Sequence, residues 1–205
     1  MKIIGLTGGI ASGKNFVAEI FRQKGAAVFD ADCEVHSLLE LDKSTILQVK
    51  NSFPESFVEG KIERKILGKI VFASAQKLKI LEEILHTQVR KKYQEFLATA
   101  QKEKKKIAVL NIPLLLETQG YECDKILAIT ASPSIQKKRF LARARKNNPK
   151  NFALEKKNLE KKFEQIRSKQ ISNFERKSRA DFTINSNASK SFVIAQVKKI
   201  FSIVS

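Results

Sequence analysis

Two alternating patterns of hydrophobic residues run along the chain. Short apolar runs indicate buried strands, and they cover residues 2–6, 26–32, 104–113, 124–130 and 181–185. The segments between them place apolar residues at helical spacing, as Val17, Ile20 and Phe21 do before Gly25 ends the pattern. Strands that alternate with helices predict an α/β fold, in which helices flank a parallel sheet.

Two long helical stretches interrupt this alternation. Residues 33–101 show helical patterns and little strand character, and helical patterns return after the fourth strand. Both stretches follow strands, so we expect them at the carboxyl edge of the sheet, where such sheets bind ligands. The predicted division is a core of about 1–32, 104–135 and 180–205, a helical insertion of about 33–103, and a basic segment of about 136–179.

Composition is that of a soluble globular protein. Hydrophobic residues make up 42% of the chain and charged residues 29%. No apolar run approaches the ~18 residues of a membrane span. The strand pattern begins at Lys2 with no signal peptide before it, so we expect a cytoplasmic protein. Cys33 and Cys123 have no His or second Cys at metal-binding spacing, which predicts two reduced thiols and no zinc site.

Positive charge is concentrated in one part of the sequence. The chain has a net charge of +18, and residues 136–179 hold 16 Lys or Arg against 4 Asp or Glu, a net of +12. Such a block attracts polyanions, which include nucleic acid, an anionic membrane and phosphorylated small molecules. The alternative is a solvated, lysine-rich helical face, so only basic residues placed near a ligand count as evidence of binding.

Residues 8–15, GGIASGKN, have the spacing of a phosphate-binding loop between a strand and a helix. In such a loop, glycines allow a nest of N–H groups, the helix adds its positive N-terminus, and Lys14 reaches the β- and γ-phosphates. The nucleotide-binding residues expected here are Gly8, Gly9, Ile10, Ala11, Ser12, Gly13, Lys14, Asn15 and Phe16. The pattern requires Ser or Thr at the position of Asn15. The hydroxyl of that Ser or Thr normally contacts Mg²⁺. We expect Asn15 to bind the metal through its amide oxygen or through a water.

Nucleotide hydrolases usually have an aspartate at the end of an apolar strand other than the one before the phosphate loop, and this chain lacks it on the best candidate strand. The strand at 107–111 ends in Asn111, whereas the second strand ends in Asp30 and Asp32. A carboxylate beside a phosphate loop can take a proton from a substrate hydroxyl, which favours phosphoryl transfer to a small alcohol. Asp30 also becomes a candidate metal ligand. The alternative is that the two aspartates cap the next helix, with Asp32 as the N-cap.

A pair of arginines lies in the basic segment. Arg139 and Arg143 are four residues apart, so they share one face of a helix. Two guanidinium groups on one face can clamp a triphosphate and stabilise the charge on a transferring phosphoryl group. A solvated basic helix remains the alternative.

These motifs together resemble the dephospho-CoA kinase family along essentially the whole chain. The matching stretches are GLTGGIASGK, DADCEVHSLL, ERKILGKIVF, LEEILH, IPLLLE, SPSIQKKRFLAR and RADFTIN. The resemblance implies a P-loop kinase with a helical substrate domain and a helical lid. It also implies that ATP phosphorylates the ribose 3′-hydroxyl of dephospho-CoA, the last step of coenzyme A biosynthesis.

The resemblance also assigns roles to residues. Lys14 and the loop amides would bind the ATP phosphates, Asp32 would be the catalytic base, and Arg143 would reach the phosphates from the lid. Arg64 and His86 would bind dephospho-CoA, and His36 matches the motif after the aspartates. We expect ATP and Mg²⁺ as cofactors, a monomer, no obligate nucleic acid and no membrane.

The chain departs from the family pattern at several positions, and other functions stay open. Asn15 and Phe16 replace two small hydroxyl residues, Thr87 replaces a proline, and Gln165 stands where the family often has arginine, with Arg167 nearby. The main alternative is another P-loop small-molecule kinase, such as a nucleoside monophosphate kinase. A nucleic-acid-binding NTP module and an inactive kinase are the remaining alternatives.

Overall fold

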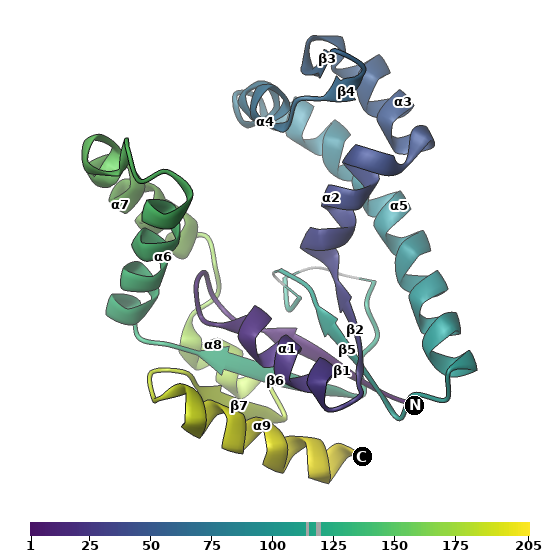
Figure 1. Cartoon of the computed structure of the whole chain (residues 1–205), viewed down its shortest axis with the longest axis vertical. Helices are drawn as coiled ribbons and strands as arrows, with labels where there is room; N and C mark the ends of the chain where they lie inside the picture. Colours follow the sequence, from purple (N-terminus) through teal and green to yellow (C-terminus); the bar gives the residue numbers. More distant parts are fainter. Residues whose placement is uncertain (114, 118–119) are drawn as a thin grey trace. The chain divides into compact units, whose positions relative to one another are not determined.

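The structure is a computed structural model that describes residues 1–113, 115–117 and 120–205 (Figure 1). The chain forms two compact units. The sheet unit comprises Met1–Phe29 and Glu103–Ser205, and the helical unit comprises Asp30–Lys102. The ends of the helical unit lie close to the sequence-based limits of about 33 and 103 for the insertion, and the basic segment falls within the sheet unit.

A five-stranded sheet organises the sheet unit, and its strands overlap the five predicted from the apolar runs, although the second ends at Asp30 and Asp32 lies in the following helix. They are β1 (Lys2–Thr7), β2 (Ala27–Asp30), β5 (Ile107–Asn111), β6 (Lys125–Thr130) and β7 (Phe182–Asn185). Their order is β2-β5-β1-β6-β7, and β1 pairs in parallel with both β5 and β6. The strand that precedes the phosphate loop is therefore the central one, with Leu6 opposite both Asn111 and Leu127.

The described residues of the same unit also form five helices. They are α1 (Lys14–Gln23), α6 (Pro133–Asn147), α7 (Phe152–Ser168), α8 (Asn173–Ser178) and α9 (Lys190–Val204). Helices α1 and α9 lie side by side (Figure 1) and share one core with the sheet, in which Val17, Phe21 and Val197 are fully buried beside Ile4 and Leu127. This packing fixes the first turn of α1 at the end of β1.

The helical unit has its own core. Its elements are α2 (Ala31–Leu41), α3 (Lys43–Ser52), the 3₁₀ turn Pro54–Ser56, β3 (Phe57–Val58), β4 (Lys61–Ile62), α4 (Arg64–Phe72) and α5 (Ala75–Lys102). Helix α5 packs against α2, α3 and α4, and Val49, Phe53 and Leu67 are buried between them. The antiparallel hairpin β3–β4 was not predicted, because two-residue strands are too short to show an alternating pattern.

Both cysteines are free thiols, Cys33 exposed and Cys123 half-buried. Burial, with a smaller contribution from Asp124, raises the pKa of the Cys123 thiol to about 11. That thiol therefore stays protonated at neutral pH. Among the described residues, no helix combines the length and apolarity needed to cross a bilayer.

Candidate active site

Residues 8–15 connect β1 to α1 in a tight turn whose backbone suits an anion. Ala11 and Gly13 adopt left-handed conformations, with φ of 54° and 102°. A left-handed residue within a turn aims neighbouring N–H groups to one side, which creates an anion-binding concavity. The Ser12 N–H donates to the Gly9 carbonyl at 3.1 Å and closes the turn. A glycine at position 13 avoids the steric cost that a side chain would have at this φ.

The N-terminus of α1 lacks the side-chain cap that five other described helices possess, as do those of α4 and α7. Side chains accept a hydrogen bond from the first turn of α2, α3, α6, α8 and α9, through Asp30, Asp42, Ser132, Ser172 and Ser189. Helix α1 begins after Gly13, with no side-chain cap and no acidic residue in its first turn. Its N–H groups and the positive end of its dipole therefore remain available to an external anion.

Lys14 lies across the loop rather than extending into solvent. Its ammonium Nζ donates to the Gly8 carbonyl at 2.7 Å. This contact holds a full positive charge over the same turn whose N–H groups form the concavity. This position is consistent with a role of Lys14 in neutralising phosphate oxygens. The ammonium lies at the start of the loop, so the side chain needs little movement to reach them.

Arg139 and Ser186 brace the loop from outside. The Arg139 guanidinium donates to the Ser186 carbonyl at 2.6 Å, to Ser186 Oγ at 2.9 Å and to the Ser12 carbonyl at 3.3 Å. Ser186 is buried, and its hydroxyl also donates to the Ser12 carbonyl at 2.6 Å. The sequence predicted that Arg139 binds a triphosphate. In the structure Arg139 also has a structural role, because its three hydrogen bonds join α6 to the phosphate loop and to the residue that follows β7.

A cavity of about 340 Å³ opens beside this brace. Its lining residues are Gly13, Phe16, Arg139, Ser186, Ala188, Lys190 and Val193. The ammonium of Lys190 lies 5.8 Å from the centre of the Phe16 ring. A flat aromatic wall, an aliphatic wall and a guanidinium are features of pockets that accept a planar heterocycle. The cavity adjoins Gly13, so it lies at the α1 end of the loop.

Asn15 pairs with Asn111, the last residue of β5. The Asn111 amide donates to Asn15 Oδ1 at 3.1 Å, and Asn111 is buried whereas Asn15 is exposed. P-loop proteins commonly hold Mg²⁺ with a Ser or Thr after the loop lysine and an Asp at the end of a neighbouring strand. In this chain the first of these positions is Asn15, and the residue that pairs with it at the end of β5 is also an amide.

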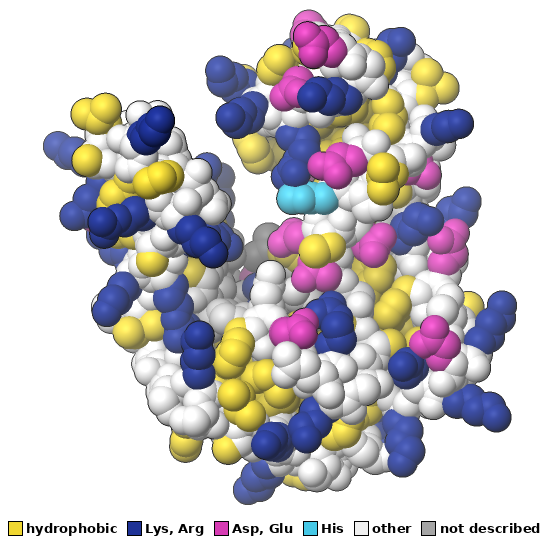
Figure 2. Space-filling model, viewed as in Figure 1, with side chains coloured by type: hydrophobic (Ala, Val, Ile, Leu, Met, Phe, Trp, Pro, Cys, Tyr) yellow, Lys and Arg dark blue, Asp and Glu magenta, His cyan; other side chains and the backbone are white. Residues whose placement is uncertain are grey.

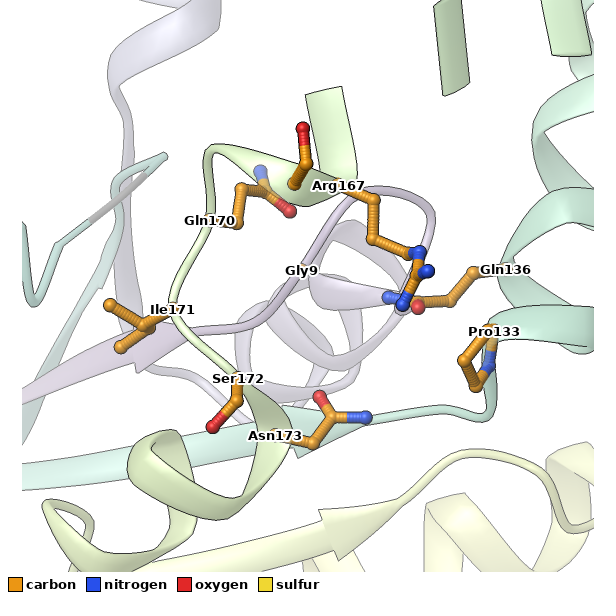
Figure 3. Close-up of a pocket in the computed structure, with 9 residues that line it drawn as sticks. Gly9, Pro133, Gln136, Arg167, Gln170, Ile171, Ser172 and Asn173 are labelled. Carbon is orange, nitrogen blue, oxygen red and sulfur yellow. The ribbon is translucent and has the colours of Figure 1, made fainter. Parts of the chain in front are cut away.

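Gln170 is a residue that the sequence did not single out as functional. Its Oε1 accepts a hydrogen bond from the Ile10 N–H of the phosphate loop at 2.9 Å. Figure 3 shows Gln170 on one side of Gly9 and Gln136 on the other, and Arg167 lines the same cavity. The two residues of the hydrogen bond are 160 positions apart in sequence, so no local pattern could have identified it.

Arg176 was also missed, and it is the largest fully buried side chain of the described chain. It donates to Thr7 Oγ1 at 2.7 Å and to the Ile171 carbonyl at 3.1 Å, and Glu117 lies 3.9 Å away. Burial lowers the pKa of Arg176, and the negative charge of Glu117 opposes that change. Because Thr7 directly precedes the loop, Arg176 anchors the end of β1. A lone arginine in a basic segment gives no sequence signal of such burial.

Most of the basic segment is exposed, and Arg143 is part of that exposed surface. Figure 2 shows Lys and Arg side chains gathered over α6 and α7. The two helices pack through Phe140 and Phe163, whose ring centres are 5.7 Å apart. Arg143 lies one helical turn beyond Arg139, so the structure keeps both arginines on one face of α6.

Asp30, not Asp32, caps the first helix of the helical unit. Asp30 Oδ1 accepts the Cys33 N–H at 3.1 Å. The alternative that made Asp32 the N-cap is therefore wrong, because helix α2 begins at Ala31, two residues earlier than that interpretation required. Asp32 lies in the first turn of α2 and is exposed. The carboxylate of Asp32 is thus not the capping group.

The other acceptor-side candidates are exposed residues of the same unit. The Arg64 guanidinium, at the start of α4, contacts the His36 ring of α2, with Nη1 and Nδ1 3.1 Å apart. A neutral imidazole has one nitrogen that can accept such a bond. His86 lies exposed on α5 and makes no hydrogen bond or ion pair in the described parts of the chain. The structure therefore brings Arg64 to His36 and leaves His86 separate.

The folded chain defines a class of protein at this point. A phosphate loop that follows the central strand of a five-stranded parallel sheet, and leads into an uncapped helix, is the site of a P-loop nucleotide-binding protein. The sequence model of the dephospho-CoA kinase family matches residues 2–191. The chain therefore belongs to the dephospho-CoA kinase family and is a kinase.

Similar proteins support this membership. A dephospho-CoA kinase of Bartonella quintana is 42% identical over 186 residues, which cover 90% of this chain and 89% of that protein. One of Wolbachia pipientis wMel is 39% identical and covers 97% of this chain and 95% of its own. Among solved structures, a Thermus thermophilus protein aligns with a TM-score of 0.80 at 26% identity, covering 100% of this chain and 98% of its own. The Campylobacter jejuni dephospho-CoA kinase aligns with a TM-score of 0.67 at 28% identity and the same coverage.

Proposed function

We propose that this kinase transfers the γ-phosphoryl group of ATP to the ribose 3′-hydroxyl of dephospho-CoA, which yields coenzyme A and ADP. A bond forms between the 3′-oxygen and the γ-phosphorus. The bond to the β,γ-bridging oxygen breaks, and ADP leaves with its electron pair. The observation that carries the proposal is the uncapped α1 behind a phosphate loop, in a chain that the family matches over residues 2–191.

The sheet unit supplies the phosphoryl donor side. Loop N–H groups and Lys14 hold the phosphates, and the cavity beside Phe16 and Arg139 takes the nucleoside. Arg143 adds positive charge to the transferring group from the basic segment, which acts as the lid. A guanidinium serves here better than an ammonium, because its planar donors match two phosphoryl oxygens at once.

The helical unit supplies the acceptor side. Asp32 accepts the proton of the 3′-hydroxyl as the new bond forms, in the role of general base. Arg64 and His86 bind dephospho-CoA, whose phosphates suit a guanidinium. The exposure of Asp32 and Arg64 supports these roles, since neither carboxylate nor guanidinium is buried within its own unit.

Mg²⁺ is expected as the partner of ATP, and Asn15 fits it only as a neutral ligand. The described residues contain no group of three or more His, Cys, Asp or Glu side chains that could hold a metal ion. Asn15 Oδ1 accepts one bond from Asn111 and has a second lone pair for the metal or for a metal-bound water. When bound, Mg²⁺ supplies positive charge to the phosphate oxygens. Asp30 is the other proposed ligand, although one of its oxygens caps α2.

The remaining proposals concern the protein's surroundings. We expect a monomer in the cytoplasm that needs ATP and dephospho-CoA, with no obligate nucleic acid and no membrane. The excess charge supports capture of phosphorylated substrates, since it is concentrated in the basic segment with a net of +12.

A kinase assay with a panel of acceptors tests the function. ADP release is measured with dephospho-CoA, AMP, CMP and shikimate, and the product is identified by mass and by the position of its new phosphate. We expect turnover with dephospho-CoA and a 3′-phosphorylated product. Phosphorylation of a nucleoside monophosphate but not of dephospho-CoA would overturn the proposal. A Lys14→Ala variant controls for contaminating kinases, because it removes the charge from the loop.

A further inference from the structure

A second cavity, of about 240 Å³, opens at the other end of the phosphate loop. Its walls come from the first turns of α6, the end of α7 and the segment that follows it (Figure 3). The residues that line it are Gly9, Pro133, Gln136, Arg167, Ser168, Gln170, Ile171, Ser172 and Asn173. None of these side chains is acidic, and four of them carry amide or guanidinium donors, of which the Asn173 amide already donates to the Ala131 carbonyl. The lining therefore suits a group rich in oxygen acceptors.

Gln136 is the most buried of the polar side chains in this cavity. Only 4% of its surface is exposed, and no hydrogen bond to its side-chain amide is found within the described residues. Its Nε2 lies 2.8 Å from the point where a Cβ on Gly9 would be. The amide lines the cavity, so its NH₂ donors and its carbonyl oxygen can form hydrogen bonds with a ligand there. The absence of a side chain on Gly9 leaves the space for this approach.

Gln170 approaches the same glycine from the opposite side. Its Oε1 is held by the Ile10 N–H at 2.9 Å and lies 3.3 Å from the position of a Gly9 Cβ. Because the oxygen is fixed on the loop, the orientation of the amide is fixed as well. The NH₂ group of Gln170 is then a second donor with a set position beside Gly9 (Figure 3).

Arg167 contributes the charge. Its Nε donates to Glu164 at 3.1 Å, which leaves the two terminal nitrogens of the guanidinium for other acceptors. Arg167 lines the same cavity as Gln136 (Figure 3). The contact with Glu164 is between exposed side chains and therefore weak. It orients Arg167 without neutralising the charge that faces the cavity.

The two cavities define the direction of a bound nucleotide. The nucleoside cavity adjoins Gly13 and the second cavity adjoins Gly9, so a triphosphate that follows the loop from one to the other ends beside Gly9. We propose that Gln136, Gln170 and Arg167 bind the terminal phosphoryl group of the nucleotide and form a γ-phosphoryl cradle. This inference rests on the proposed phosphoryl donor, ATP, and is independent of the acceptor.

If these residues bind the γ-phosphoryl group, their replacement should lower the affinity for a nucleoside triphosphate and leave the affinity for a diphosphate unchanged. ADP and the non-hydrolysable analogue AMPPNP are titrated by calorimetry into wild type, Gln136→Leu, Gln170→Leu and Arg167→Met, all at one Mg²⁺ concentration. We expect the affinity for AMPPNP to fall about tenfold or more in each variant, as for loss of a donor to a charged group, while the affinity for ADP stays within about twofold. Gly9→Ala should lower AMPPNP affinity as well, because its Cβ would displace both amides.

Matched controls separate the cradle from general effects. Gln165→Ala removes an exposed amide from α7, and Arg145→Met removes an exposed charge from α6, and neither should change the ratio of the two affinities. An equal loss of ADP and AMPPNP would mean that the three residues only support the loop, and unchanged affinities would mean that the cavity serves another purpose. Either result overturns the proposal. Gln170 and Arg167 are not fully buried, so Gln170→Leu and Arg167→Met should fold. These two variants test the proposal even if Gln136→Leu does not fold.

The outcome is also separable from that of the acceptor assay. If the wild type discriminates AMPPNP from ADP through these residues but phosphorylates another acceptor, the cradle stands and the proposed substrate falls. If dephospho-CoA is phosphorylated while the variants bind both nucleotides like the wild type, the proposed function stands and the cradle falls.

Discussion

The phosphate loop and the acceptor-side residues are built in opposite ways. The loop is partly buried and is braced by distant parts of the chain, with hydrogen bonds from Arg139 and Ser186 to Ser12, and with Arg176 on Thr7. The acceptor-side residues Asp32 and Arg64 are exposed on first helical turns, and Arg64 contacts the His36 ring. The donor side is therefore preorganised by the core, whereas the acceptor side is carried on helix surfaces.

This difference has a thermodynamic consequence. A preorganised loop holds its N–H groups and charges in place before substrate arrives, so little reorganisation is needed during the reaction. Substitutions there change stability and activity together, because the same contacts serve both. Exposed residues on helix ends have few contacts, so their replacement changes catalysis or binding with little effect on stability. Four predictions, each centred on one residue, test the contrast.

Asp32→Asn should have the largest effect. Loss of a positioned base lowers turnover by at least ~10²-fold, while the melting temperature and ATP affinity stay near wild type, because Asp32 is exposed and is not the helix cap. Steady-state kinetics with dephospho-CoA and thermal unfolding provide the two readouts. Turnover within threefold of wild type would remove Asp32 from the mechanism.

Arg176→Met should lower stability and, with it, turnover, because Arg176 anchors the end of β1 before the loop. It leaves the Thr7 hydroxyl and the Ile171 carbonyl without their donor, which costs about 1–3 kcal/mol for buried polar groups. Adding Thr7→Val should recover part of the loss, since removing both partners leaves fewer unpaired groups. Denaturant unfolding of the two single variants and the double variant measures the coupling. Strict additivity would mean that the hydrogen bond between these side chains contributes nothing.

Arg64→Ala should weaken substrate binding on the acceptor side. We expect the KM for dephospho-CoA to rise about tenfold, as for a lost charged hydrogen bond, with an unchanged KM for ATP and an unchanged melting temperature. Arg90→Ala is the matched control, because it removes an exposed arginine from α5 of the same unit. A similar rise in the KM for dephospho-CoA in both variants would mean that the effect comes from the lower net charge and not from a contact of Arg64.

Substitutions of Asp30 should have the smallest effect of the four predictions. Two of them distinguish its role as a helix cap from its proposed role as a metal ligand. Asp30→Ala removes the acceptor of the Cys33 N–H and should cost about 1 kcal/mol. Asp30→Ser keeps a capping oxygen and should restore most of that stability while removing the carboxylate. Thermal unfolding reports the cap, and a Mg²⁺ titration of activity reports the metal. An unchanged titration in Asp30→Ser would exclude Asp30 as a ligand.

Local patterns predicted the elements of this fold well. Five apolar runs became the five strands, and the glycine-rich turn before Lys14 became the phosphate loop. Such features depend on neighbouring residues, since burial of a strand and the φ of a turn are set within a few positions. The hairpin β3–β4 was missed for the same reason, because each strand is only two residues long.

The sequence by itself determined an α/β chain with a phosphate loop after its first strand and membership in a kinase family. The tertiary structure alone decided what surrounds that loop. Gln170 reaches Ile10 across 160 positions, Arg176 reaches Thr7 across 169, and Asn111 reaches Asn15 across 96. A hydrogen bond depends on distance and direction in space, and sequence spacing carries neither once the chain has folded back on itself.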